Sequence, residues 1–259
     1  MALSKLQAEE IENVLKHSLR TKFSNYNPEP AAMPFHTRLL GKDRLALFSF
    51  IHSLNTNFGT SIFEPVAASL ARNNFVKVQL QATAGTQISE YAQRVIQDIM
   101  DDLRAANTQP CKVNEIEALR EVCTKGVMRT VKPTKVDILL ESSEGQIYMI
   151  DLKAAKPNKG EFQGFKRTLL EWAAVKLATD PKADIHTLIA IPYNPYEPKP
   201  YSRWTMAGML DLQEELKVAA EFWNFLGGDN SYDDLLCCFE RVGIELRPEI
   251  DAYFSKFEK

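Results

Sequence analysis

Asp137, Asp151 and Lys153 are the residues whose types and spacing suggest a defined chemistry in this chain. An Asp/Glu-x-Lys triplet occurs four times, so the triplet alone says little. The triplets at 180–182 and 197–199 lie in proline-interrupted loops, and 215–217 is expected on a helix, where side chains two residues apart diverge. Asp151-Leu152-Lys153 instead ends an apolar run with strand character, so its two charged side chains share one face.

Asp137 lies on a second expected strand just before this run. Residues 135–141 alternate, 142–145 favour a turn, and a turn centred on Glu144 makes Asp137 and Asp151 cross-strand partners with Cβ atoms about 5 Å apart. Facing carboxylates repel each other unless a proton or a cation lies between them. Because the potential ligands are all oxygens, Mg²⁺ fits best and Mn²⁺ can substitute. A register slip of one residue would instead leave an ordinary charged hairpin.

This arrangement predicts phosphodiester hydrolysis by a Mg²⁺-activated water. The ion would act as a Lewis acid, and the ammonium of Lys153 would stabilise the attacking water or the negative charge that develops on the phosphate.

The surrounding periodicity indicates a strand, strand, helix, strand order within an otherwise helical chain. Helices are expected over 6–23, 42–71 with a split near 55–59, 88–105, 160–178, 209–226 and 232–242, and a further strand over 187–191. We therefore expect an α/β fold, with a mixed β-sheet flanked by helices and a helical N-terminal half. We interpret residues 1–259 as a single domain, composed of a mainly helical part (1–124), a catalytic sheet core (125–200) and C-terminal helices (201–259).

Composition limits the class of protein. The net charge of −3 argues against a protein that coats nucleic acid indiscriminately. The sequence has no long apolar segment, and its four cysteines form no CxxC pair, so we expect a cytoplasmic protein without a membrane partner or a zinc site.

The order Asp137, hairpin, Asp151-Leu152-Lys153, amphipathic helix, strand resembles the PD-(D/E)XK nuclease superfamily, although Val136 stands where that motif often has proline. The blocks 34–41, 53–67 and 222–228 are similar to the TdeIII-type restriction endonucleases. The resemblance implies a restriction-endonuclease-like core and a type II restriction enzyme that cuts double-stranded DNA at a GC-rich interrupted palindrome of the GGNCC kind. A cognate DNA methyltransferase is then expected as genetic partner, and a two-fold homodimer would match the symmetric DNA site.

The resemblance also suggests two further catalytic residues. Glu64 interrupts an apolar run and would be a third metal ligand, or else a charge that favours the helix start before Pro65. Gln163, on the helix after the catalytic strand, would hold the DNA backbone or a catalytic water.

DNA contacts are expected from polar residues around this core. Lys125, Arg129, Lys132 and Lys135 precede the first catalytic strand and would grip phosphates, unless they form an ordinary basic loop. Further phosphate contacts would come from Lys166 and Arg167, unless these lie on a solvated helix face. Asn194 and Arg203 lie in a loop after a core strand and are candidates for reading bases.

Two other functions stay open at this point. A repair or junction-resolving nuclease could use the same core, and would prefer damaged or branched DNA. A DNA-binding module without catalysis could keep the fold alone, but the clustered charges of Asp137, Asp151 and Lys153 are costly without a metal.

Overall fold

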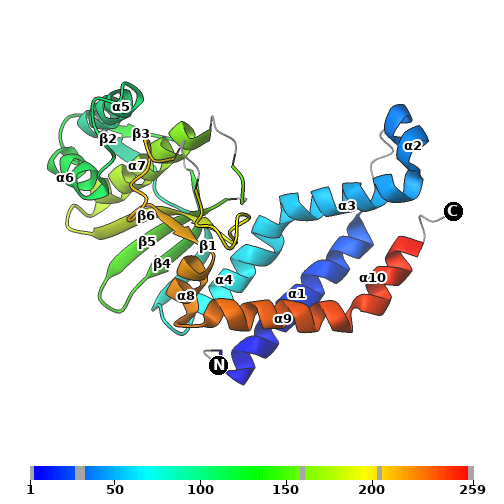
Figure 1. Ribbon diagram of the computed structural model, residues 1–259. Coiled ribbons are helices and arrows are strands. Elements are labelled where there is room, and N and C mark those ends of the chain that lie inside the picture. Colours follow the sequence, from blue (N-terminus) through cyan, green and yellow to red (C-terminus); the bar gives the residue numbers. More distant parts are fainter. Residues whose placement is uncertain are drawn as a thin grey trace.

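The computed structural model describes residues 3–26, 33–132, 134–153, 155–157, 161–202 and 206–255, except for the side chains of 54–58 and 60. It consists of a lobe built around a β-sheet and an arm of long helices that extends from it (Figure 1). No helix in these ranges is both long and apolar enough to cross a membrane.

A five-stranded mixed sheet forms the centre of the lobe, in the order β1-β4-β5-β6-β7. The first three strands in this order pair antiparallel, and β6 and β7 continue the sheet in parallel. A separate antiparallel pair joins β2 and β3. The strands are β1 (Lys77–Thr83), β2 (Gln87–Ser89), β3 (Met128–Thr130), β4 (Lys135–Glu141), β5 (Gln146–Leu152), β6 (Asp184–Ile191) and β7 (Leu216–Val218).

Helices cover both faces of the sheet, because neighbouring residues of each strand point to opposite sides. Leu139 packs in a core with helices α5 (Glu90–Arg104), α6 (Lys112–Val122) and α7 (Phe162–Thr179). Ile138 on the same strand packs in a second core, with helices α1 (Lys5–Asn25), α4 (Glu64–Ala71), α8 (Ala220–Gly227) and α9 (Ser231–Glu245). Asp137 lies two residues before Leu139, and Asp151 two residues after Met149, which is in the same core. Both aspartates therefore lie on the face of the sheet that α7 covers.

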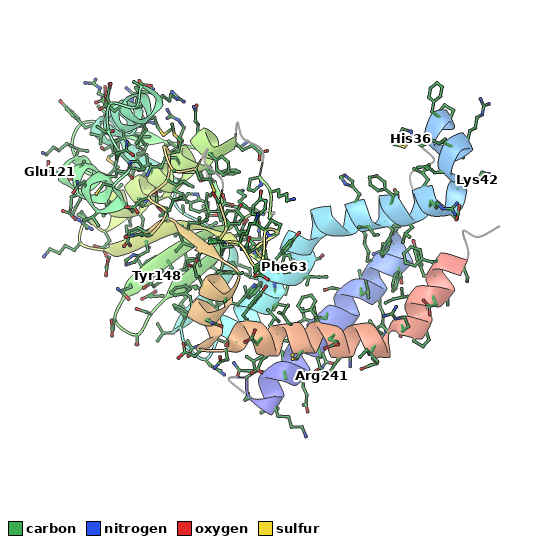
Figure 2. All side chains as sticks on the ribbon, viewed as in Figure 1. His36, Lys42, Phe63, Glu121, Tyr148 and Arg241 are labelled. Carbon is green, nitrogen blue, oxygen red and sulfur yellow. The ribbon has the colours of Figure 1, made fainter. Side chains whose placement is uncertain are left out.

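The arm begins where α4 leaves the sheet. A π-helical turn, η1 (Gly59–Phe63), joins α4 to α3 (Lys42–Phe58), which runs outward beside α1 to the short helix α2 (Pro34–Leu40) (Figure 1). The side chain of Phe63 lies at the junction with the sheet, and those of His36 and Lys42 lie at the far end (Figure 2). The rings of Phe23, Phe50 and Tyr253 pack against one another with centres 4.8–5.5 Å apart, and thereby join α1 and α3 to α10 (Arg247–Phe254).

The expected helices and hairpin are largely present, but the helix predicted over 209–226 is wrong. Its first part forms turns and then β7, whose residues pair with Ile189–Ile191, and α8 begins only at Ala220. Local periodicity resembled a helix here, whereas pairing with a distant strand decides the structure. Near 55–59, where a split between two helices was expected, α3 ends at Phe58 and is joined to α4 by the π-helical turn η1. Strands β1, β2, β3 and β7 and helices α2, α6 and α10 were also not predicted from the sequence.

Candidate active site

The β4–β5 hairpin places the two predicted aspartates opposite each other. Its pairs run from Glu141↔Ile147 to Ile138↔Ile150, and the next step of this register is Asp137 with Asp151. The turn is held by Ser142, whose carbonyl accepts from the N–H of Gly145 at 3.0 Å and whose hydroxyl accepts from two further backbone N–H groups. Gly145 has φ +86°, a backbone conformation that favours glycine. The register predicted from a turn centred on Glu144 is therefore confirmed.

Burial and neighbouring charge make Asp151 an unusual carboxylate. The residue is 6% exposed, and its Oδ1 lies 2.7 Å from the Nζ of Lys153. Burial is the largest effect and raises the pKa of Asp151 to about 6; Asp137, within hydrogen-bonding reach, raises it further, while Lys153 lowers it. Oδ2 of Asp137 accepts a hydrogen bond from the backbone N–H of Leu152 at 2.9 Å, which fixes the orientation of the Asp137 carboxylate.

These side chains open into a cleft of about 470 Å³ between the sheet and α7. The ammonium of Lys153 also lies 4.7 Å from the centre of the Phe165 ring, so a residue of α7 helps to hold it in place. Trp172, also on α7, forms part of the wall of the cleft, and its indole N–H donates to the hydroxyl of Thr134 at 2.8 Å. The cleft is lined by Lys135, Asp137, Asp151, Lys153, Glu161, Gly164, Phe165, Thr168 and Trp172.

Glu64 reaches this site through a residue that sequence analysis missed. Gln81 of β1 donates from Nε2 to Oε2 of Glu64 at 2.9 Å and to Oδ1 of Asp137 at 3.2 Å. Glu64 is 3% exposed, and burial is the largest of the effects that raise the pKa of its carboxyl. No short motif marks Gln81; its position opposite Asp137 becomes visible only once the pairing of β1 with β4 is known.

The residues of the cleft fit a divalent metal ion such as Mg²⁺. Within the described ranges, no group of three or more His, Cys, Asp or Glu side chains lies close enough together to hold a metal. Mg²⁺, however, usually takes only one or two protein carboxylates and completes its shell with water and substrate phosphate. Asp137 and Asp151 supply two such carboxylates, and an ion between them would remove the repulsion that the pair carries.

Two predicted residues on α7 do not face the cleft. Gln163 is exposed and accepts a hydrogen bond from Nε of Arg104 at 3.1 Å, on the side of α5. Arg167 is half-buried and donates to Gln97 of α5 at 2.6 Å.

The prediction that Lys166 contacts DNA is wrong. Its side chain is 0% exposed, and its Nζ lies 2.5 Å from Glu115 and 2.6 Å from Glu215. An ammonium enclosed in this way cannot reach a phosphate. Spacing along a helix does not reveal which side a charged residue faces when acceptors from distant segments cover it.

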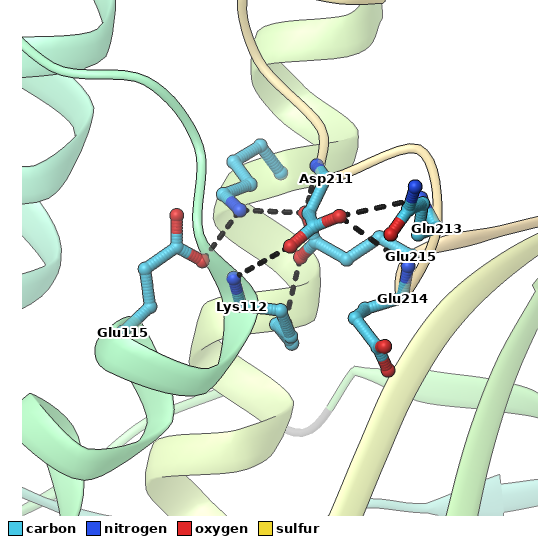
Figure 3. A network of polar contacts seen from close by, with 7 residues as sticks. Lys112, Glu115, Asp211, Gln213, Glu214 and Glu215 are labelled. Atoms are coloured by element: carbon cyan, nitrogen blue, oxygen red, sulfur yellow. Dashed lines mark hydrogen bonds and ion pairs between the residues drawn. The ribbon is translucent and has the colours of Figure 1, made fainter.

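Lys166 belongs to a buried cluster of charges that joins α6, α7 and the segment before β7 (Figure 3). Lys112 Nζ pairs with Glu215 at 2.7 Å, so this glutamate receives two ammonium groups. The backbone N–H of Asp211 also donates to Glu215, and the Asp211 carboxylate accepts from the N–H groups of Lys112, Gln213 and Glu214. These two lysines hold the pKa of Glu215 below its usual value despite burial.

The remaining predicted DNA contacts have different surroundings. Four exposed residues precede or begin β4, of which only the last lines the cleft: Lys125, Arg129, Lys132 and Lys135. Asn194 binds within its own loop, since its amide donates to the carbonyl of Lys199 at 2.7 Å and accepts from the N–H of Tyr196 at 3.0 Å. Arg203 lies outside the described residues.

Comparison with known proteins gives consistent matches along the chain. The family described as "Type II restriction endonuclease, HinfI" matches residues 3–243. The chain is 27% identical to the type II restriction enzyme MjaII of Methanocaldococcus jannaschii, covering 89% of this chain and 68% of that enzyme. It is 23% identical to the type II restriction enzyme HgiCII of Herpetosiphon aurantiacus, covering 84% and 80%. A second enzyme of that organism, HgiEI, is 22% identical over 84% and 79%.

Proposed function

Because this chain belongs to the HinfI family of type II restriction endonucleases, we propose that Asp137, Asp151 and Lys153 form the site at which it hydrolyses the backbone of double-stranded DNA. The observation that carries the proposal is the opposed pair of carboxylates, one of them buried with its pKa raised to about 6 and bound to a lysine. Such groups are costly to bury in a protein that does not use them.

In this proposal, Asp137 and Asp151 hold Mg²⁺ or Mn²⁺, and Glu64 is the further acidic residue of the site. When bound, the ion supplies Lewis acidity towards the phosphate and activates a water for attack. Lys153 places a positive charge where negative charge develops, since Asp151 and the Phe165 ring already orient its ammonium. Trp172 and α7 restrict the space beside the phosphate.

The substrate would lie along exposed basic residues that precede or begin β4. Lys135 lines the cleft itself, and Lys125, Arg129 and Lys132 precede it in the chain, so this segment would contact phosphates. The loop that contains Asn194 would read bases at a short GC-rich interrupted palindrome of the GGNCC kind, together with Arg203. A DNA methyltransferase of the same specificity would protect the host DNA.

A symmetric DNA site calls for two copies of this chain, one for each strand. The far end of the arm offers an apolar surface for this contact: α2 has no buried residue, and Phe35 and Leu39 are 81% and 83% exposed. A two-turn helix is marginal in water without a partner. In α2, α3 and the residue before α2, the exposed large apolar side chains are Met33, Phe35, Leu39, Leu40, Leu47, Phe48 and Ile51.

Together these side chains offer roughly several hundred Å², of the order that each partner buries in a standard interface, about 800 Å². A Phe35→Asp variant should therefore sediment as a monomer where the wild-type chain sediments as a dimer. Leu236→Asp, at a 50% exposed position on α9, is the control that should leave the dimer intact. A wild-type chain that is monomeric on its own and on DNA would refute the dimer.

The function itself is tested by digestion of unmethylated plasmid or phage DNA with Mg²⁺, Mn²⁺ or EDTA, followed by sequencing of the fragment ends. We expect discrete metal-dependent fragments that share one short palindrome, no cutting by Asp151→Ala, and normal cutting by Asp98→Ala at an exposed site on α5. Cutting of branched DNA alone would indicate a repair nuclease. Tight binding without any cleavage would indicate a DNA-binding module.

A further inference from the structure

The side chain of Gln81 lies between the carboxylates of Glu64 and Asp137. Its single amide nitrogen donates to Glu64, which begins α4, and to Asp137 on β4. A primary amide has two N–H donors, so this contact uses both of them, one for each carboxylate. The charge of Asp137 raises the pKa of Glu64, which means that Gln81 bridges two groups that would otherwise repel each other.

The backbone at Gln81 is unusual for a strand. Its φ is +51°, in the left-handed region that residues other than glycine, asparagine and aspartate seldom adopt. The flanking pairs Leu80↔Ile138 and Ala82↔Val136 keep their register, whereas Gln81 itself is not paired with Asp137 through the backbone. The strand therefore gives up one step of regular pairing at the residue whose side chain bridges the carboxylates. Strained residues of this kind are concentrated at functional sites.

We propose that Gln81 is a positioning residue of the metal site, which holds Glu64 and Asp137 side by side in the orientation that receives the ion. The inference rests on the proposed function, because it assumes that the carboxylates of the cleft bind a divalent cation. Gln81 donates its hydrogen bonds to carboxylates that would hold the ion, and would therefore act through them. Residues that hydrogen-bond metal ligands from behind fix ligand orientation, and their loss typically costs 10–100-fold in metal affinity or activity.

The variants are chosen to separate the side chain from the backbone. Gln81→Leu keeps the approximate volume and removes both N–H donors. Gln81→Asn keeps the amide and suits a left-handed backbone better, but it is one methylene shorter and cannot bridge both carboxylates. Gln79→Leu makes the same change at an exposed position two residues earlier on β1, and serves as the matched control.

The readout is Mn²⁺ binding to the DNA-free protein at pH 8. Binding is measured from the electron paramagnetic resonance signal of the Mn²⁺ that remains free. We expect Gln81→Leu and Gln81→Asn to weaken Mn²⁺ binding about 10–100-fold, and Gln79→Leu to bind as the wild type does. A double-mutant cycle with Glu64→Gln should be non-additive, because Gln81 acts partly through Glu64. Thermal unfolding of each variant, which should stay cooperative, identifies any loss of fold.

Each outcome decides the inference. If folded Gln81→Leu and Gln81→Asn bind Mn²⁺ as tightly as the wild type, Gln81 does not position the site, and the proposed function stands without it. If the wild type binds no Mn²⁺ and cuts no DNA, the proposed function and this inference fail together. Should Gln81→Leu unfold, Gln81→Asn decides alone, since its backbone preference does not oppose the native conformation.

Discussion

Asp151→Asn should stabilise the metal-free protein at neutral and alkaline pH while it abolishes cleavage. Folding takes this carboxyl from its ordinary pKa of 3.8 to about 6, so the folded state binds the proton more tightly than the unfolded chain does. Stability therefore falls as pH rises from about 4 to about 6 and stays at the lower level above that range. The difference corresponds to roughly 3 kcal/mol at pH 8, as an upper bound. An asparagine carries no charge and avoids this cost, yet its carbonyl can still accept from Lys153.

The assay is thermal unfolding in EDTA at pH 8 and at pH 4. For a chain of this size, a gain of about 3 kcal/mol raises Tm by roughly 6–12 °C. We expect a gain of that order at pH 8 and a much smaller difference at pH 4, which lies close to the ordinary pKa of 3.8, so that little of the cost of ionising Asp151 in the folded state has yet appeared. Asp98→Asn, at an exposed position, should change Tm little at either pH. Mg²⁺ should then raise the Tm of the wild type but not that of Asp151→Asn. A Tm at pH 8 equal to or below that of the wild type would refute the reasoning, because Lys153 would then outweigh burial.

Three further predictions concern the cluster, the DNA path and one glycine. Lys166→Met should destabilise the fold by roughly 3–5 kcal/mol in denaturant unfolding, because Glu215 keeps its charge in the core with one ammonium fewer; a loss below about 1 kcal/mol would contradict this. Lys135→Gln should weaken DNA binding and make it less dependent on salt, by about one counterion in the slope of log K against log salt; an unchanged slope would place this lysine off the DNA. Gly85→Ala should lower Tm, since a Cβ there would lie 2.4 Å from Cγ1 of Val175 and the backbone has φ +149°; an unchanged Tm would mean that α7 yields at no cost.

The catalytic hairpin could be predicted because its determinants are local. The alternation of β4, the turn at Ser142–Gly145 and the apolar run of β5 are all contained in 135–152, so the register that opposes Asp137 and Asp151 follows from a short stretch. The mixed sheet flanked by helices and the type II restriction endonuclease assignment are confirmed as well. The matching family is HinfI, whereas the blocks at 34–41, 53–67 and 222–228 suggested the TdeIII type.

What could not be predicted depends on contacts between distant segments. Gln81 meets Asp137 across 56 residues of sequence, and Lys166 meets Glu115 and Glu215 across 51 and 49. A glutamine in an edge strand and a lysine on a helix have no sequence signal that distinguishes them from solvated side chains. In both cases burial and hydrogen-bond partners, rather than residue type, decide the role.

The π-helical turn η1 has a consequence for insertions and deletions in this family. A π turn accommodates one residue more than an α turn, and each residue of an α-helix advances the chain by about 100°. Loss of a single residue from Gly59–Phe63 would convert this turn to an α turn, and the side chains of α3 would keep nearly the same phase relative to Glu64, because the π turn holds the extra residue within itself. Loss of a single residue from the α-helical part of α3 would instead rotate everything before it by about 100° relative to Glu64. A change of one residue in η1 should therefore disturb the arm and the active site less than the same change in α3.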